Sequence, residues 1–306
     1  MLERKIVGMA PAVRLGLMRV IISISALAAV LTVPIVSFSK VSPAWFKPVG
    51  ILQWIPAHLF SKLLSSPEML LSYQCLLIMV LLLSIFGVFS RVSVFIAAVL
   101  FTLYTGILRS YGTLFNAGFI LVYLLFFLSL LPCGNGFSID MKRKSSVGAE
   151  PDLQPDIHFG WGVFLLRAVL ALSCLFAAYA KVYHSGISWF EHSNLKNYLL
   201  QEVLQSGNFE GSVMASAFHM PKIFWLCLSA ALFLCELLFP LILVSWHFRS
   251  SFAFFYITVQ AVLAILCPPL ALDVLCMSLL ALICFDWDRI LLTAKLPLQD
   301  RRRRGY

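Results

Sequence analysis

Long apolar runs recur along the whole chain, and most are close to the ~20 residues that a helix needs to cross a bilayer. Hydrophobic residues make up 61% of the chain and charged residues only 12%, which leaves too few polar side chains to cover a soluble surface. The runs are continuous and lack the alternating pattern of membrane barrel strands. Because backbone in hydrocarbon must satisfy its own hydrogen bonds, the sequence predicts an all-α integral membrane protein, a bundle of about eight transmembrane helices.

We expect spans near 16–37, 69–90, 92–109, 117–133, 160–183, 222–246, 250–267 and 270–287. Arg91 alone separates the second run from the third, and Pro268-Pro269 divides the last two, so each pair is expected to form a tight helical hairpin. The first run is too long for a cleaved signal peptide and is expected to remain as a span. The chain then divides into an N-terminal segment 1–15, a transmembrane domain 16–290 and a basic tail 291–306.

Lysine and arginine are distributed unequally between the loops, and this bias predicts the orientation. With the N-terminus inside, the cytoplasmic side carries fifteen of them: Arg4, Lys5, Arg14, Arg19, Arg91, Lys142, Arg143, Lys144, Arg249, Arg289, Lys295 and Arg301 to Arg304. The opposite side carries six: Lys40, Lys47, Lys62, Arg109, Lys196 and Lys222. We therefore expect both termini in the cytoplasm, with a bacterial inner membrane as the location. The net charge of +9 is assigned to this topology and to anionic lipid, and no nucleic-acid partner is expected.

Two loops, 38–68 and 184–221, fall outside the cytoplasm in this topology and carry many apolar side chains. The second places Leu195, Tyr198 and Leu199 on one face of a short helix, so we expect these loops to lie in the membrane interface or to fold over the mouth of the bundle. The polar loop 134–158 is interpreted as a solvated linker. The eight cysteines lie within or at the ends of apolar runs, which predicts buried thiols instead of a disulfide framework.

Four ionisable residues lie within the expected spans, where a charge costs about 2.5–3.5 kcal/mol. Arg167 and Glu236 have similar expected depths in consecutive antiparallel spans, so we predict an intramembrane ion pair between them. Lys181 lies ~21 Å further along the helix of Arg167 and is not explained by that pair. It either snorkels to the interface or, partly desolvated, acts as a base. Asp273 is interpreted as a wet boundary residue, with a proton relay as the alternative.

Motifs for familiar catalytic chemistry are absent from the sequence. His184, His192 and His219 share the second outer loop with Glu191, but their spacing matches no metal signature, and no metal site is predicted. We find no Ser-His-Asp arrangement, phosphate-binding glycine loop or Cys-x-x-Cys pair.

Three segments, taken in order, resemble the HTTM family, the membrane domain related to vitamin K-dependent gamma-carboxylase. The exit of the fourth span, 131–140 (LPCGNGFSID), is similar to the leucine-proline and serine-leucine-aspartate-like exit of that family. The stretch 176–183 (FAAYAKVY), followed by Trp189, resembles its aromatic-alanine-glycine, lysine-leucine and tryptophan stretch. The stretch 233–240 (FLCELLFP) resembles its glutamate-leucine-x-phenylalanine-proline element.

The resemblance implies a lipid-embedded quinol site in which Lys181 is the candidate catalytic base, since the matched lysine of the carboxylase deprotonates reduced vitamin K. Supporting positions are Trp189, His184, His192, Gln260 and Asp273. Gln260 stands where the family has a histidine, Ala178 replaces a frequent glycine, and no large lumenal domain follows to hold a glutamyl substrate. Peptide carboxylation is therefore not expected.

Three hypotheses for the function remain open. The first is an HTTM-like multi-pass protein that binds a quinone, a quinol or another lipidic ligand near Lys181; as an enzyme it would carry out quinol-coupled redox or carboxylase-like chemistry. The second is a non-catalytic membrane partner in the maturation or export of, or immunity to, a secreted peptide, with that peptide or a thiol-oxidoreductase as partner. The third, a transporter, would need inverted repeats or broken helices that the sequence does not display.

Overall fold

The computed structural model describes residues 7–42, 45–54, 64, 66–112, 116–146, 155–205, 219–243, 246–267 and 271–285. Every regular element in these ranges is a helix, and their only β-type pairing is an isolated bridge between Ala10 and Asp156. The predicted all-α fold is confirmed. The basic tail 291–306, with its run of arginines, lies outside the described residues.

Each of the eight expected spans coincides with a helix: α2 (Ala12–Thr32), α4 (Pro67–Phe86), α5 (Ser90–Ser110), α6 (Asn116–Leu130), α8 (Ile157–Ser185), α11 (Lys222–Leu238), α12 (Trp246–Leu266) and α13 (Ala271–Ala281). Six helical segments of the described chain are long and apolar enough to cross a membrane, whereas α6 and α13 are shorter apolar helices. The expected hairpin of α4 and α5 is present, with only residues 87–89 between the two helices. The short helix expected in the loop 184–221 is confirmed as α9 (His192–Gln205).

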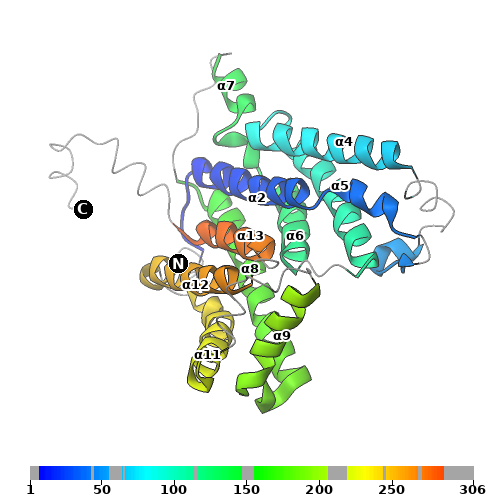
Figure 1. Ribbon diagram of the computed structural model, residues 1–306. Helices are drawn as coiled ribbons and strands as arrows, with labels where there is room; N and C mark the ends of the chain where they lie inside the picture. The colour runs from blue at the N-terminus through cyan, green and yellow to red at the C-terminus, as the bar shows by residue number, and fades with distance from the viewer. Residues whose placement is uncertain are drawn as a thin grey trace.

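Helix α2 lies at the centre of the bundle and contacts α4, α6, α8 and α13. Figure 1 shows α4 and α5 on one side of α2, with α13 and α12 on the other. The long helix α8 leads toward α9 and α11, which pack against each other at the far end. This arrangement puts the last turns of α8 beside the second outer loop.

The outward faces of the helices are as apolar as the core, as expected for a protein surrounded by lipid. On α4, for example, Leu70 and Leu77 are fully buried while Met69 and Met79 are each about half exposed. Because lipid gives no hydrophobic drive to helix association, contacts between the helices depend on close packing and on internal hydrogen bonds.

Polar side chains inside the bundle connect α2 with its neighbours. The hydroxyls of Ser23 and Ser84 lie 2.7 Å apart and join α2 to α4. The Tyr104 hydroxyl on α5 reaches the carbonyls of Ala29 and Val33 at 3.1 and 2.8 Å. These bonds occupy groups that would otherwise be costly in a water-free interior.

Arg19 is fully buried within α2, although the loop count assigns it to the charges that flank the first span. The helix begins at residue 12, one turn earlier than expected, so Arg19 lies within the helix and inside the bundle. The guanidinium donates to the carbonyls of Cys133 (2.8 Å), Phe137 (2.6 Å) and Ile85 (3.5 Å) and to the Ser90 hydroxyl (3.3 Å). A buried cation is thus stabilised by backbone oxygens of two inter-helix turns.

The segment 131–140 folds around this arginine. It contains the 3₁₀ turn η4 (Cys133–Asn135) and leads into α7 (Ile139–Ser146). A Cβ atom on Gly16 would lie 2.1 Å from the Gly136 carbonyl oxygen, so the backbones meet where only glycine fits. The Asp140 carboxylate accepts from the Phe89 amide (3.0 Å) and from the Ser90 amide and hydroxyl (both 2.8 Å), and so caps the start of α5.

The Gly16–Gly136 contact predicts opposite outcomes for two helical glycines. Alanine raises helix propensity by about 1 kcal/mol at either position. For Gly162→Ala we expect a melting temperature in detergent near or above wild type, since its Cβ would meet only side-chain ends of Leu131 and Leu15 at 3.3 Å. For Gly16→Ala we expect a fall of several degrees, because backbone atoms must separate. Equal melting temperatures for the two variants would contradict the close approach.

The cap on α5 predicts a pH dependence of stability. Partial burial raises the pKa of the Asp140 carboxyl, but hydrogen bonds from Ser90 and Phe89 and the charge of Arg143 outweigh it, so the pKa is lowered overall. A carboxyl with a lowered folded-state pKa stabilises the fold above its unfolded pKa, about 3.9, and loses this contribution as the pH falls through the folded value. The melting temperatures of wild type and Asp140→Asn should therefore differ at neutral pH and converge in acid. A constant difference would argue against the cap.

Candidate functional site

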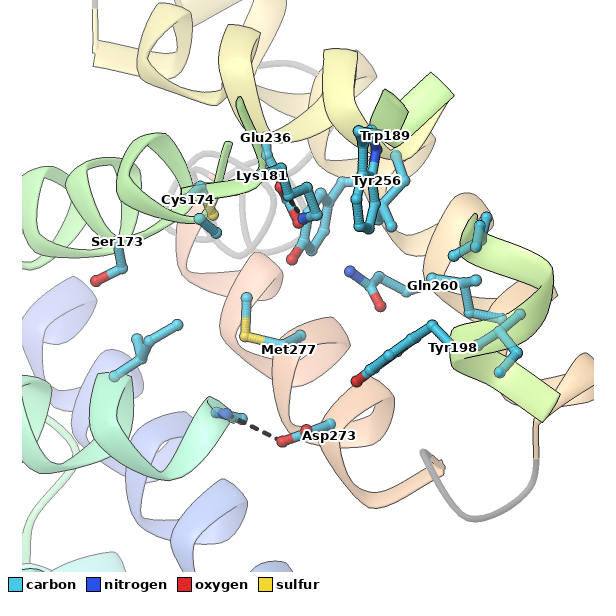
Figure 2. Close-up of a pocket in the computed structure, with 17 residues that line it drawn as sticks. Ser173, Cys174, Lys181, Trp189, Tyr198, Glu236, Tyr256, Gln260, Asp273 and Met277 are labelled. Atoms are coloured by element: carbon cyan, nitrogen blue, oxygen red, sulfur yellow. Dashed lines mark hydrogen bonds and ion pairs between the residues drawn. The ribbon is translucent and has the colours of Figure 1, made fainter. Parts of the chain in front are cut away.

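A cavity of about 350 Å³ lies between α6, α8, α11, α12 and α13. The 3₁₀ turn η5 (Gly186–Phe190) and helix α9 also line it. Leu195 and Leu199 of α9 are buried against it, as expected for a loop that folds over one end of the bundle. Figure 2 shows Lys181, Glu236, Trp189 and Tyr256 gathered in one part of the cavity.

Lys181 on α8 forms an ion pair with Glu236 on α11, its Nζ donating to Glu236 Oε2. The two side chains are 16% and 9% exposed, so both charges are largely removed from water. Two opposite charges in contact can remain ionised in such a place, whereas either one alone would be strongly disfavoured. The predicted Arg167–Glu236 pair is wrong, because Glu236 pairs with Lys181 instead.

The end of α11 differs from the expected span. With 222–246 as one continuous span, Glu236 is expected level with Arg167. Pro240 cannot donate to the helical ladder, and the α-helix ends at Leu238, followed by the 3₁₀ turn η6 (Phe239–Leu243), which packs against α8. Where α11 and η6 pack against α8, Glu236 faces Lys181.

Arg167 is buried and has a different partner. Its Nε donates to the carbonyl of Ile283 (3.2 Å), and its Nη2 donates to those of Cys284 (3.1 Å) and Phe285 (3.3 Å). These carbonyls belong to the 3₁₀ turn η8 (Leu282–Cys284) after α13 and to the residue that follows it. Carbonyls at a helix C-terminus lack partners within the helix and favour a nearby cation. Arg167 therefore fixes the end of α13 and takes no part in the cavity.

Trp189 in η5 contacts the ion pair from the loop side. The Lys181 ammonium lies 5.2 Å from the centre of its ring, a cation–π arrangement that adds to the stabilisation of the charge. The indole Nε1 is buried and has no hydrogen-bond partner among the described residues. Trp189 thus ties the second outer loop to the charged part of the cavity.

Tyr256 and Gln260 form the α12 wall beside the ion pair. Tyr256 is almost fully buried, and its hydroxyl interacts with the side chains of Gln260 and Cys174. In Figure 2 the Gln260 amide lies between this tyrosine and Tyr198 of α9. Uncharged groups able to donate and accept hydrogen bonds therefore extend the polar part of the cavity away from Lys181 and Glu236.

Asp273 lines the cavity at its other side, where α13 begins. Its Oδ1 accepts a 3.0 Å hydrogen bond from the Ala117 amide at the start of α6 (dashed in Figure 2). A carboxylate at a helix N-terminus is stabilised by the amides exposed there. Asp273 therefore positions α6 against α13 while presenting polar atoms to the cavity.

Five of the residues singled out from the sequence share this cavity: Lys181, Glu236, Trp189, Gln260 and Asp273. His184 is exposed and stacks edge-on with Tyr183 outside it. His192 begins α9, and its side chain lies outside the described residues. No group of three or more metal-ligating side chains occurs in the described part of the chain.

Tyr198 and Tyr256 are site residues that the sequence analysis missed as such. Tyr256 carries no charge and lies in an apolar run, so a search for ionisable groups in spans passes over it. Tyr198 is noted only as part of the apolar face of α9. Its position three residues after Leu195 and one before Leu199, both buried, is the signal that it also faces the bundle.

Comparisons with protein-family models, with curated proteins and with solved structures found no match to this chain. The resemblance to the HTTM family therefore stays a prediction.

The pairing of Lys181 with Glu236 predicts a specific pattern of coupling. Lys181→Met and Glu236→Gln should each cost about 3–5 kcal/mol of unfolding free energy, because each leaves a buried charge without its partner. The double variant should cost clearly less than the sum. Unfolding in detergent micelles, followed by circular dichroism, gives the unfolding free energies of wild type, the two single variants and the double variant.

The matched cycle uses Arg167→Gln with Glu236→Gln. Arg167 and Glu236 do not contact each other, so their losses should add to within about 0.5 kcal/mol. Strong coupling in this second cycle, with additivity in the first, would restore the ion pair predicted from the sequence and overturn the one described above.

Proposed function

We propose that the cavity binds a lipidic ligand with a quinone-like or phenolic head, and that this head lies against Lys181 and Glu236. One observation carries the proposal: a charged pair screened from water forms the wall of a mainly apolar cavity inside a membrane bundle. The volume of about 350 Å³ falls within the ~300–1,000 Å³ typical of small-molecule sites. The resemblance to the HTTM family supports the same position, since Lys181 is the residue matched.

The chemistry of the pair suits such a head. A quinone carbonyl accepts a hydrogen bond from the Lys181 ammonium, and the reduced form offers a hydroxyl that can donate to the Glu236 carboxylate. Tyr256 and Gln260 provide further donors and acceptors beside it. The apolar remainder of the cavity suits a ring and the beginning of a hydrocarbon tail.

The ion pair also determines which group would take a proton. As members of an ion pair, Lys181 is the ammonium and Glu236 the carboxylate, so the carboxylate is the group of the pair that can accept a proton. A phenolic O–H bound there would transfer its proton to Glu236, and the Lys181 ammonium would stabilise the phenolate that remains. In this proposal the two residues form one acid–base unit, with Lys181 acting mainly through its charge.

The chain is a multi-pass membrane protein on the strength of its six long apolar helices. We propose that the protein lies in a bacterial inner membrane. The loop charges support an orientation with both termini in the cytoplasm. The bridge between Ala10 and Asp156 supports this topology, because it brings the N-terminal segment and the loop before α8 to one end of the bundle.

Ligand binding can be tested by titrating the purified protein with a short-chain quinone and following tryptophan fluorescence. For Glu236→Gln and Lys181→Met we expect affinity to fall at least about tenfold, equivalent to about 1.4 kcal/mol, because each removes one half of the polar contact. Mass spectrometry of lipid extracts should likewise find quinone retained by wild type and lost from both variants.

Two exposed residues supply matched controls. Glu68→Gln and Lys222→Met make the same chemical changes on the surface of α4 and α11, outside the cavity, and should leave affinity unchanged. Wild-type protein that binds no quinone, or equal losses in site and control variants, would refute the proposed function.

A further inference from the structure

A second hollow, of about 640 Å³, lies at the turn between α4 and α5. It is bounded by the first residues of α5, by the segment 132–135 and by Asp140 and Arg143 at α7. It shares no residue with the Lys181 cavity. The quinone-like ligand proposed for the Lys181 cavity would therefore not occupy this hollow.

The charge in this hollow is predominantly positive. Arg91 is exposed and has neither a hydrogen bond nor an ion pair within the described residues. Arg143 is exposed beside Asp140, and Lys142 precedes it on α7. The two arginines carry one charge more than the Asp140 carboxylate beside them, so the lining keeps a net positive charge that attracts an anion.

The hollow lies at the level where lipid headgroups are expected. The turn 87–89 joins two helices that are each long enough to cross a bilayer, so it emerges at the membrane surface. Phe89 and Val92 beside the hollow are 68% and 58% exposed. Cationic side chains next to exposed apolar ones match a molecule with a charged head and hydrocarbon chains.

We propose that this hollow binds the phosphate headgroup of an anionic membrane lipid, held by Arg91 and Arg143 while Phe89 and Val92 contact the acyl chains. Guanidinium groups suit a phosphate because their parallel N–H donors can engage two oxygens at once. The site is independent of the quinone-like ligand proposed for the Lys181 cavity. A bound headgroup would also connect α5 and α7 at the turns that enclose Arg19.

Native mass spectrometry in detergent tests the proposal with two lipids of the same chain length, phosphatidylglycerol and phosphatidylcholine. We expect wild type to retain phosphatidylglycerol at least about fivefold more than phosphatidylcholine. The double variant Arg91→Gln/Arg143→Gln should lose this preference. Both arginines are exposed, and circular dichroism checks that the variant is folded. Arg91→Lys/Arg143→Lys should keep only part of the preference, because the charge remains but the paired N–H donors are lost.

Arg109→Gln is the matched control, since it removes a charge from the exposed opposite end of the same helix, where the guanidinium lies over Phe119. It should leave the preference intact. Three outcomes would overturn the proposal: wild type without a preference, an equal loss in Arg109→Gln, or displacement of phosphatidylglycerol by millimolar inorganic phosphate. The last would assign the hollow to free phosphate instead of lipid.

Discussion

The absence of water inside a membrane bundle determines where each buried charge of this chain lies. A charge in hydrocarbon needs a partner in contact with it, and three of the buried or nearly buried cations of α2 and α8 meet this demand in two ways. Arg19 and Arg167 are surrounded by backbone carbonyls at the ends of neighbouring helices. Lys181 pairs with the carboxylate of Glu236. The arginines hold helix ends together, whereas the lysine and the glutamate line an internal cavity.

Hydropathy predicts most of the fold because the membrane imposes one simple rule on length and composition. It locates all eight apolar helices and the tight turn at Arg91, and the spacing of Leu195 and Leu199 locates α9. It fails for Arg19, because an arginine near the start of an apolar run looks like a charge at the membrane surface. Only the contact of α2 with the segment 131–140 reveals that this residue is inside.

Five residues of the candidate site could be predicted from the sequence, but which of the charged residues pair could not. Lys181, Glu236 and Asp273 are identifiable as ionisable groups in apolar runs, and Trp189 and Gln260 follow from the family resemblance; all five line one cavity. Their pairing depends on how α11 packs against α8, which a count of residues from the expected span ends does not give. In the structure Glu236 lies beside Lys181, and Arg167 is bound by the carbonyls after α13.

An experimental map of the cavity in protein extracted directly into lipid nanodiscs, by electron cryomicroscopy, would test the account most directly. The account predicts density for a ring-shaped head against Lys181 and Glu236, near Trp189, with a tail that continues along the apolar wall. A cavity filled by water alone or closed by its own side chains, with Lys181 turned away from Glu236, would contradict it.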